Sequence, residues 1–316
     1  MPDSSAQAPD PSSVRLEGPW THRDVSANGI RLHVAESGSG PAVLLLHGFG
    51  EFWWVWHHQV RDLADAGFRV IAVDLRGYGD SDKPPRGYDG WTLAGDVTGL
   101  VRALGERDAH LVGHGWGGLL AWSAAILHPR IVRSVSVLGG AHPIALRSAF
   151  GRSLPRRRGQ AAAMRHLVRS QLPILPERRL VADDAAELER LVLAWSGPGW
   201  PSRPTFGDTM RRMRSALRVP GVAHSALEYY RWAFRSQFRG DGRRFAAAVG
   251  GRSRAPVLQL HGAEDGCVLT DTARESAPWR GPRSRFELLD GVGHFPHLEA
   301  PAVTGAVLRE FLRLHG

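Results

Sequence analysis

One short turn constrains the fold of this chain most strongly: Gly113-His114-Gly115-Trp116-Gly117-Gly118. It follows an apolar run at 109–112 and precedes an apolar stretch at 119–127, which predicts a buried strand, a sharp turn and a helix. Glycines allow the positive φ angles and close backbone approach that such a turn imposes. The strained turn holds its central side chain out over the edge of a sheet. Here the central residue is Gly115, so no side chain projects from the centre of the turn.

Short apolar runs bounded by turn residues recur along the chain, as expected for strands that are buried on both faces. Two runs, at 22–25 and 30–35, flank Asn28-Gly29, which predicts a two-residue hairpin turn. Further strands are predicted at 42–46, 69–74, 132–138, 256–261 and 285–289, and helices at 92–104 and 302–314. Strands that alternate with helices predict an α/β fold with a mostly parallel, doubly wound sheet.

The pattern changes in the middle of the chain. Between 142 and 245 no core strand is indicated, and amphipathic pieces such as 185–195 alternate with joints rich in Pro and Gly. We therefore predict an inserted helical cap at 142–245 on an α/β core formed by 18–141 and 246–316. Residues 1–17 are rich in Ser, Pro, Asp and Ala, and we expect them to form a disordered tail.

The charge of the chain is strongly positive, with a net charge of +9 and a pI near 10.9. Lys83 is the only lysine, so nearly all of that charge is arginine, a skew that resembles the codon usage of a GC-rich genome. No nucleic-acid motif accompanies it, and we expect no nucleic acid partner. The cluster Arg156-Arg157-Arg158 is interpreted as a solvated cap surface, with contact to an anionic membrane or substrate head group as the alternative.

Cysteine content, targeting segments and ligand-binding motifs exclude several classes of protein. The single cysteine, Cys267, excludes an internal disulfide and permits a reducing compartment. No apolar run approaches the about 20 residues of a membrane span, and the first residues lack the pattern of a signal peptide, so we expect a cytoplasmic protein. No metal-ligand spacing or phosphate-binding loop occurs, so we expect a small-molecule ligand, no cofactor and no metal. Nothing in the sequence indicates an oligomeric state.

Three motifs together resemble a known family. They are His47-Gly48-Phe49-Gly50, the stretch from Asp74 to Ser81, and the turn around Gly115. They are similar to motifs of the α/β-hydrolases with a helical cap, in the epoxide hydrolase and haloalkane dehalogenase branch. The turn matches the nucleophile elbow Gly-His-Asp-Trp-Gly-Gly of that branch, with Gly115 in place of the aspartate. The chain also resembles actinobacterial proteins named as epoxide hydrolases whose elbows carry a small residue.

The resemblance implies an acid–base pair and an oxyanion hole. His294, in a loop after the last predicted strand, stands where the family keeps its catalytic histidine. Asp265, after the preceding strand, matches the acid that fixes the tautomer of such a histidine, and Glu264 is the alternative. The backbone amides of Phe49 and Trp116 match the oxyanion hole, which does not depend on side-chain identity.

The resemblance also implies contacts to substrate. Epoxide hydrolases of this branch use two cap tyrosines to donate hydrogen bonds to the epoxide oxygen. Tyr230 matches one of them, whereas no tyrosine occurs between 142 and 227, so the second is absent. We expect His47, Trp116 and Tyr230 to contact the substrate. A haloalkane dehalogenase would carry a halide-binding asparagine where this chain has Phe49.

The missing nucleophile leaves several functions open. No covalent intermediate can form on Gly115, so an epoxide-hydrolase-like enzyme would use His294 and Asp265 as a general base on water. Turnover would otherwise be weak or absent, in a pseudo-hydrolase that binds a small ligand as receptor, carrier or scaffold. Cys267 is a further candidate nucleophile, although thiol activation needs a cationic neighbour. Gly115 is also compatible with a deliberate silencing of the site.

Overall fold

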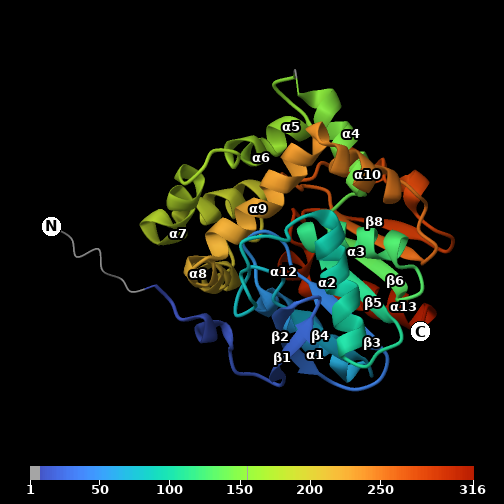
Figure 1. Cartoon of the computed structure of the whole chain (residues 1–316). Coiled ribbons are helices and arrows are strands. Elements are labelled where there is room, and N and C mark those ends of the chain that lie inside the picture. The colour runs from blue at the N-terminus through green and yellow to red at the C-terminus, as the bar shows by residue number, and fades with distance from the viewer. Residues whose placement is uncertain (1–7, 155) are drawn as a thin grey trace.

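The computed structural model describes residues 8–154 and 156–316 and shows an α/β protein with a layer of helices above its sheet (Figure 1). Within the described residues, eight strands form one sheet in the order β1-β2-β4-β3-β5-β6-β7-β8. The strands are β1 Thr21–Ala27, β2 Ile30–Ser37, β3 Ala42–Leu46, β4 Arg69–Val73, β5 Ala109–His114, β6 Val132–Leu138, β7 Val257–Gly262 and β8 Arg285–Leu289.

The pairing of the strands confirms the predicted sheet. β1 pairs antiparallel with β2 through the Asn28-Gly29 turn, where both residues have positive φ, 49° and 78°. β2 also runs antiparallel to β4, whereas the neighbours from β4 through β3 to β8 are all parallel. The order reverses between β3 and β5, where β3 lies between β4 and β5. In open parallel sheets ligands bind at the carboxyl ends of the strands near such a switch point.

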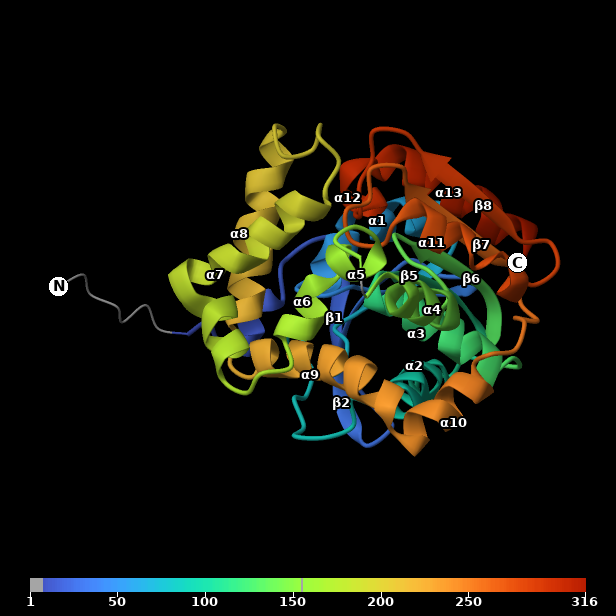
Figure 2. The same cartoon turned by 90° about the horizontal axis from the view of Figure 1, so that it is seen from above.

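Helices cover both faces of the sheet (Figure 2). α1 and α13 pack together on one face, and α2 and α3 pack together on the other. The α-helices of the core are α1 His57–Asp65, α2 Gly90–Ala103, α3 Trp116–Leu127, α11 Thr270–Arg274, α12 Pro296–Glu299 and α13 Pro301–Leu314, with 3-10 turns η2 Trp53–Trp56 and η4 Ala277–Trp279.

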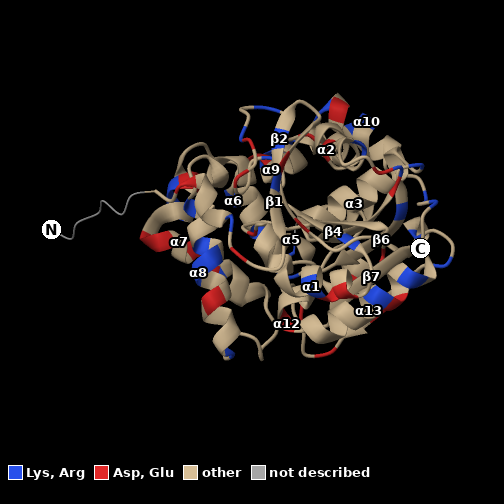
Figure 3. Ribbon diagram, turned by 90° about the horizontal axis from the view of Figure 1, so that it is seen from below, with Lys and Arg blue, Asp and Glu red and all other residues tan. Residues whose placement is uncertain are grey.

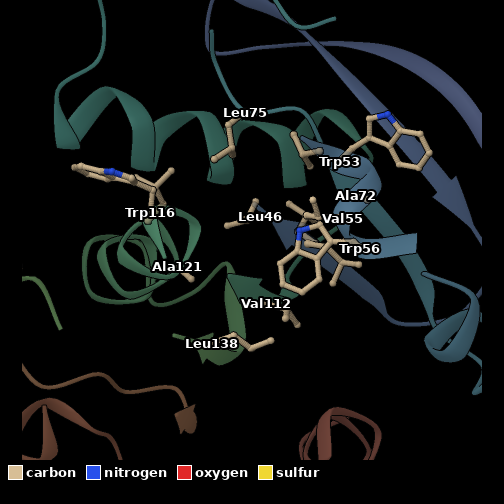
Figure 4. Close-up of a cluster of buried hydrophobic side chains, with 14 of the residues drawn as sticks. Leu46, Trp53, Val55, Trp56, Ala72, Leu75, Val112, Trp116, Ala121 and Leu138 are labelled. Atoms are coloured by element: carbon tan, nitrogen blue, oxygen red, sulfur yellow. The ribbon is translucent and has the colours of Figure 1, made fainter. Parts of the chain in front are cut away.

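The core between these layers is continuous and contains large aromatic side chains. Figure 4 shows Leu46 of β3, Val112 of β5 and Leu138 of β6 in the same buried cluster as Trp53 and Trp56 of η2. All five are almost completely buried. Burying one such side chain contributes about 1.5–3 kcal/mol. This packing fixes the strands whose carboxyl ends carry the site.

The segment between β6 and β7 is helical in the described residues and lies over the carboxyl ends of the strands (Figures 1 and 2). We call α4–α10 the cap helices. They are α4 Pro143–Ser153, α5 Gln160–Ala163, α6 Arg165–Arg169, α7 Leu175–Trp195, α8 Pro204–Arg218, α9 Val222–Arg235 and α10 Gly240–Ala248, with the 3-10 turn η3 Ser236–Phe238. α7 is interrupted by non-helical backbone from Ala182 to Ala185.

The N-terminal segment corrects one expectation. Residues 1–7 lie outside the described residues, but Pro11–Val14 form the 3-10 turn η1 and Val14 is buried. The Val14 carbonyl accepts a hydrogen bond of 2.8 Å from the indole of Trp53, and Arg15 pairs with Asp80 at 2.6 Å. The disordered tail predicted for 1–17 therefore does not extend to residue 17, because its last residues gain apolar and ionic partners on the core.

Charged residues of both signs lie near one another on the outer helices, for example on α8 and α13, as Figure 3 shows. On these helices arginine is therefore interspersed with acidic residues. No helix among the described residues is long and apolar enough to cross a membrane.

Candidate active site

The turn between β5 and α3 has the geometry of a nucleophile elbow. Gly115 has φ 50° and ψ −111°, a conformation that L residues rarely adopt. Its N–H donates to the Leu138 carbonyl at 3.1 Å, and the Gly117 N–H donates to the His47 carbonyl at 3.1 Å. A Cβ on Gly117 would collide with the Leu46 carbonyl oxygen, which explains a glycine at that position.

Neighbouring atoms do not require a glycine at position 115. A Cβ there would lie 3.5 Å from His294 Nε2 and 3.8 Å from Gly48 Cα, which are ordinary van der Waals distances. The elbow therefore has space for a side chain that the chain does not supply. We refer to this space as the gap.

His294 and Asp265 meet beside the gap. His294 Nδ1 lies 2.8 Å from Asp265 Oδ2, and both side chains are buried. The other carboxylate oxygen accepts N–H bonds from Cys267 at 2.7 Å and Val268 at 2.8 Å. Burial opposes ionisation, but the adjacent His294 ring and these hydrogen bonds hold the pKa of Asp265 below its usual value. Asp265 is therefore an anion that keeps the proton of His294 on Nδ1 and leaves Nε2 facing the gap.

The alternative residues near this pair are unsuited to its role. Glu264 is exposed, so it cannot replace Asp265 as the partner of His294. Cys267 is buried, and desolvation followed by the charge of Asp265 raises the pKa of its thiol well above the usual value. The thiol stays protonated and is a poor nucleophile. The arginine cluster 156–158 is exposed on the cap.

Two backbone amides border the gap. The N–H of Trp116 is the first of α3, and the N–H of Phe49 follows β3 in the loop that Gly117 contacts. Neither donates a hydrogen bond to another group of the described residues. The first amides of a helix carry the positive end of its dipole. The two predicted oxyanion donors thus lie on adjacent elements with their hydrogens unused.

The two neighbouring tyrosines of α9 have different surroundings. Tyr229 donates from its hydroxyl to the Arg76 carbonyl at 2.8 Å, which fixes the cap on the core. Tyr230 lines the cavity, with its ring 4.8 Å from that of Phe49 and 5.5 Å from that of Trp116. Burial, and to a smaller extent the nearby Cys267 side chain, raises the pKa of Tyr230 well above its usual value. The hydroxyl therefore stays protonated and can donate a hydrogen bond.

His47 corrects another expectation. It is fully buried, its Nδ1 donates to the Gly48 carbonyl at 2.9 Å, and its Nε2 accepts from the Leu75 N–H at 3.1 Å. Both ring nitrogens are engaged and the ring is not part of the cavity wall. His47 therefore shapes the loop that carries Phe49, rather than contacting a substrate as predicted.

A buried network that the motifs did not reveal supports the site from behind. Glu51 Oε2 lies 2.7 Å from His114 Nδ1 and accepts the Gly48 N–H at 2.6 Å, while Oε1 lies 3.1 Å from His297 Nε2. His114 Nε2 lies 2.9 Å from the His294 carbonyl oxygen. Both neighbours of the His114 ring are acceptors, so both of its nitrogens must donate.

The charges in this network follow from those contacts. Burial lowers the pKa of His114, but the facing Glu51 outweighs it and the net pKa is raised. Burial raises the pKa of Glu51, but His114 and His297 bring it well below its usual value. Ligand atoms of these three side chains lie within 4.8 Å of one another, a spacing that could suit a metal ion, yet they already bond to each other. We therefore interpret them as an ion-pair network. Glu51 precedes η2 and was missed because its partners are distant in sequence.

His166 of α6 is a second residue that the sequence did not single out. Its ring lies 5.0 Å from that of Tyr230 and 4.9 Å from that of Trp195. Its Nε2 is buried without a hydrogen-bond partner in the described residues. Burial, and to a smaller extent the nearby His294 ring, lowers the pKa of His166 to about 3, so the His166 ring is neutral at physiological pH. The sequence could not indicate this position, because the contacts of His166 with Trp195 and Tyr230 form only when the cap helices pack together.

These groups enclose a cavity of about 150 Å³ between the elbow and the cap helices. Most of its wall is apolar, as is usual for small-molecule sites. The wall includes Phe49, Gly115, Trp116, Arg147, Tyr230 and His294.

Comparison with known proteins agrees with this geometry. The profile of the alpha/beta hydrolase fold family matches residues 41–301. The chain is 31% identical to the AB hydrolase superfamily protein YfhM of Bacillus subtilis, over 92% of this chain and 96% of that one. It is 32% identical to epoxide hydrolase A of Mycobacterium tuberculosis, over 93% of this chain and 98% of that one.

Solved structures of similar proteins have the same fold. The epoxide hydrolase VrEH1 of Vigna radiata superposes with a TM-score of 0.75 at 27% identity, covering 93% of this chain and 98% of that one. An epoxide hydrolase from an endophytic Streptomyces gives 0.76 at 29% identity, covering 94% and 96%. The chain belongs to the alpha/beta hydrolase family. Within that family it lies in the epoxide hydrolase branch.

Proposed function

We propose that this protein is an epoxide-hydrolase-like enzyme that opens a small, fairly apolar epoxide with water and without a covalent intermediate. One observation carries the proposal: His294 is oriented by Asp265 at 2.8 Å, and its free Nε2 faces the gap at Gly115. A buried His–Asp pair aimed into a cavity is suited to general-base catalysis. The names of the similar proteins supply the reaction class.

The proposed reaction places water in the gap. One of the Phe49 and Trp116 amides donates to the water oxygen and positions it, and Nε2 of His294 accepts one of its protons. The water oxygen bonds to an epoxide carbon while the carbon–oxygen bond of the ring breaks. Tyr230 donates a hydrogen bond to the leaving oxygen. The proton that His294 took from water is then delivered to this oxygen, which gives a diol and restores neutral His294.

Turnover by the wild type and by His294→Ala on a panel of small epoxides tests this proposal. Loss of the base should reduce turnover by about 10²–10⁴-fold. His58→Ala, which removes an exposed histidine of α1, is the matched control and should leave turnover unchanged. Equal turnover by wild type and His294→Ala would overturn the proposal.

The vacant position at Gly115 favours a second function, which is binding of a small apolar ligand without turnover. In this alternative a ligand fills the cavity under the cap helices and is not converted. His294→Ala should then leave the affinity for the ligand unchanged, because the apolar contacts of the ligand remain. Absence of turnover on the panel, together with saturable binding of apolar ligands, would select it.

A further inference from the structure

The gap at Gly115 is bordered by hydrogen-bond donors and by no acidic side chain. The N–H groups of Trp116 and Phe49 have no acceptor within the described part of the chain. His294 also faces the gap, with Nε2 3.5 Å from the position that a Cβ on residue 115 would take. The His294 side chain is only 6% exposed, so it is a buried polar group aimed at the gap.

The electrostatics of the cavity suit an anion. None of the described residues that form its wall is acidic, and Arg147 is the only one with a permanent positive charge. The amide of Trp116 begins α3, which is 12 residues long, so its dipole favours negative charge at the gap. The Asp265 carboxylate lies behind His294, and its Oδ1 accepts hydrogen bonds from the N–H groups of Cys267 and Val268.

The gap is also open to a ligand from the cavity, because Gly115, Trp116 and His294 all line the cavity wall. Apart from Gly115 and its two chain neighbours, the nearest atoms to the Cβ position of residue 115 are His294 Nε2 at 3.5 Å and Gly48 Cα at 3.8 Å, so no side chain blocks the approach to this turn. A carboxylic acid that enters from the cavity side would place one oxygen toward the amides and share its own proton between the other oxygen and Nε2 of His294. Charge-assisted hydrogen bonds of this kind are about twice as strong as neutral ones.

The rest of such a ligand would lie among apolar side chains. The cavity wall beyond the elbow includes Met164 and Leu167 near α6 and Trp195 at the end of α7. An aliphatic or aromatic chain buries apolar surface there, at about fourfold in affinity for each methylene. A second charge that lay among these apolar side chains would be desolvated, since Arg147 is the only permanently charged side chain among the described residues of the wall.

We propose that the site binds apolar monocarboxylic acids, with the carboxylate in the gap that the missing nucleophile leaves and the chain under the cap helices. This inference rests on the proposed function for the location of the substrate site, but it does not require turnover. Such acids compete with the substrate for the space in front of His294.

Isothermal titration of the wild type with straight-chain acids from acetate to octanoate tests the inference. Each acid is paired with the primary amide of the same length, which has the same shape and no charge. We expect affinity to rise about fourfold per methylene until the cavity is full. We also expect the acid to bind at least tenfold more tightly than its amide. Equal affinity of acids and amides would overturn the inference without any need for a variant.

Gly115→Asp supplies the protein's own carboxylate and is the second arm. It should weaken acid binding at least tenfold while amides, which lack the repelled charge, lose less. Undiminished acid binding by a folded Gly115→Asp protein would place the carboxylate elsewhere and overturn the inference. Epoxide turnover without acid binding would refute the inference and leave the proposed function intact. Acid binding without turnover would do the reverse.

Discussion

Glu51→Gln tests whether the network behind the elbow is an ion pair. The substitution keeps the shape of the side chain and removes the charge that faces His114 at 2.7 Å. Both groups are almost completely buried, and His114 must donate from both nitrogens. Removing one partner of a buried ion pair costs about 3–5 kcal/mol, because the other charge is left without compensation. That is a large part of the about 5–15 kcal/mol that stabilises a typical domain.

Urea unfolding followed by circular dichroism measures this loss. The control is Glu275→Gln, which removes the same charge from an exposed pair with Arg152 at 2.6 Å. Exposed pairs contribute about 0–1 kcal/mol. A loss of unfolding free energy in Glu51→Gln no larger than in the control would refute the ion-pair interpretation.

The pH dependence of this difference follows from the pKa shifts. The lowered pKa of Glu51 stabilises the folded protein above the ordinary value of 4.5, and this stabilisation disappears as pH falls through the folded pKa. The raised pKa of His114 stabilises it below the ordinary value of 6.5, and this is lost as pH rises through the folded pKa. The difference between wild type and Glu51→Gln should therefore be largest between about pH 4.5 and 6.5.

The two tyrosines of α9 give a pair of opposite predictions. Tyr230→Phe removes the donor that faces the cavity and should reduce epoxide turnover by about 10²-fold with little change in unfolding free energy. Tyr229→Phe removes the bond to the Arg76 carbonyl and should lower unfolding free energy by about 1–3 kcal/mol, because a buried carbonyl loses its donor. Steady-state kinetics and urea unfolding on both variants check the pair, and interchanged effects would show that the roles are reversed.

Much of the fold could be predicted from periodicity alone. β3, β6 and β8 have the bounds that the sequence predicts. β3 is a continuous apolar run that is buried at every position, as expected for a strand covered on both faces, whereas β8 at the edge of the sheet is only partly buried. The N-terminal segment could not be predicted, since Val14 and Arg15 are ordered by tertiary contacts to Trp53 and Asp80. The composition of a segment indicates whether it can form a core of its own. It does not indicate whether the segment packs against a core formed by residues far away in the sequence.

The candidate site was predicted unevenly for a similar reason. Asp265 and His294 lie inside local motifs, so the resemblance could propose them as a pair, and the structure brings their side chains within 2.8 Å. Glu51 and His166 could not be identified, because their partners come from remote segments and their own neighbours carry no pattern. His47 was misassigned because its motif marks the loop, whereas its ring faces the core.

The source of the oxygen in the diol tests the central claim most directly. A single turnover of wild type in H₂¹⁸O should place ¹⁸O in the diol at once, because Gly115 offers no carboxylate to attack the epoxide. Gly115→Asp in the same experiment should release mostly unlabelled diol in its first turnover, because its ester intermediate transfers a carboxylate oxygen. Unlabelled diol from the wild type would reveal a covalent nucleophile and contradict the proposed mechanism.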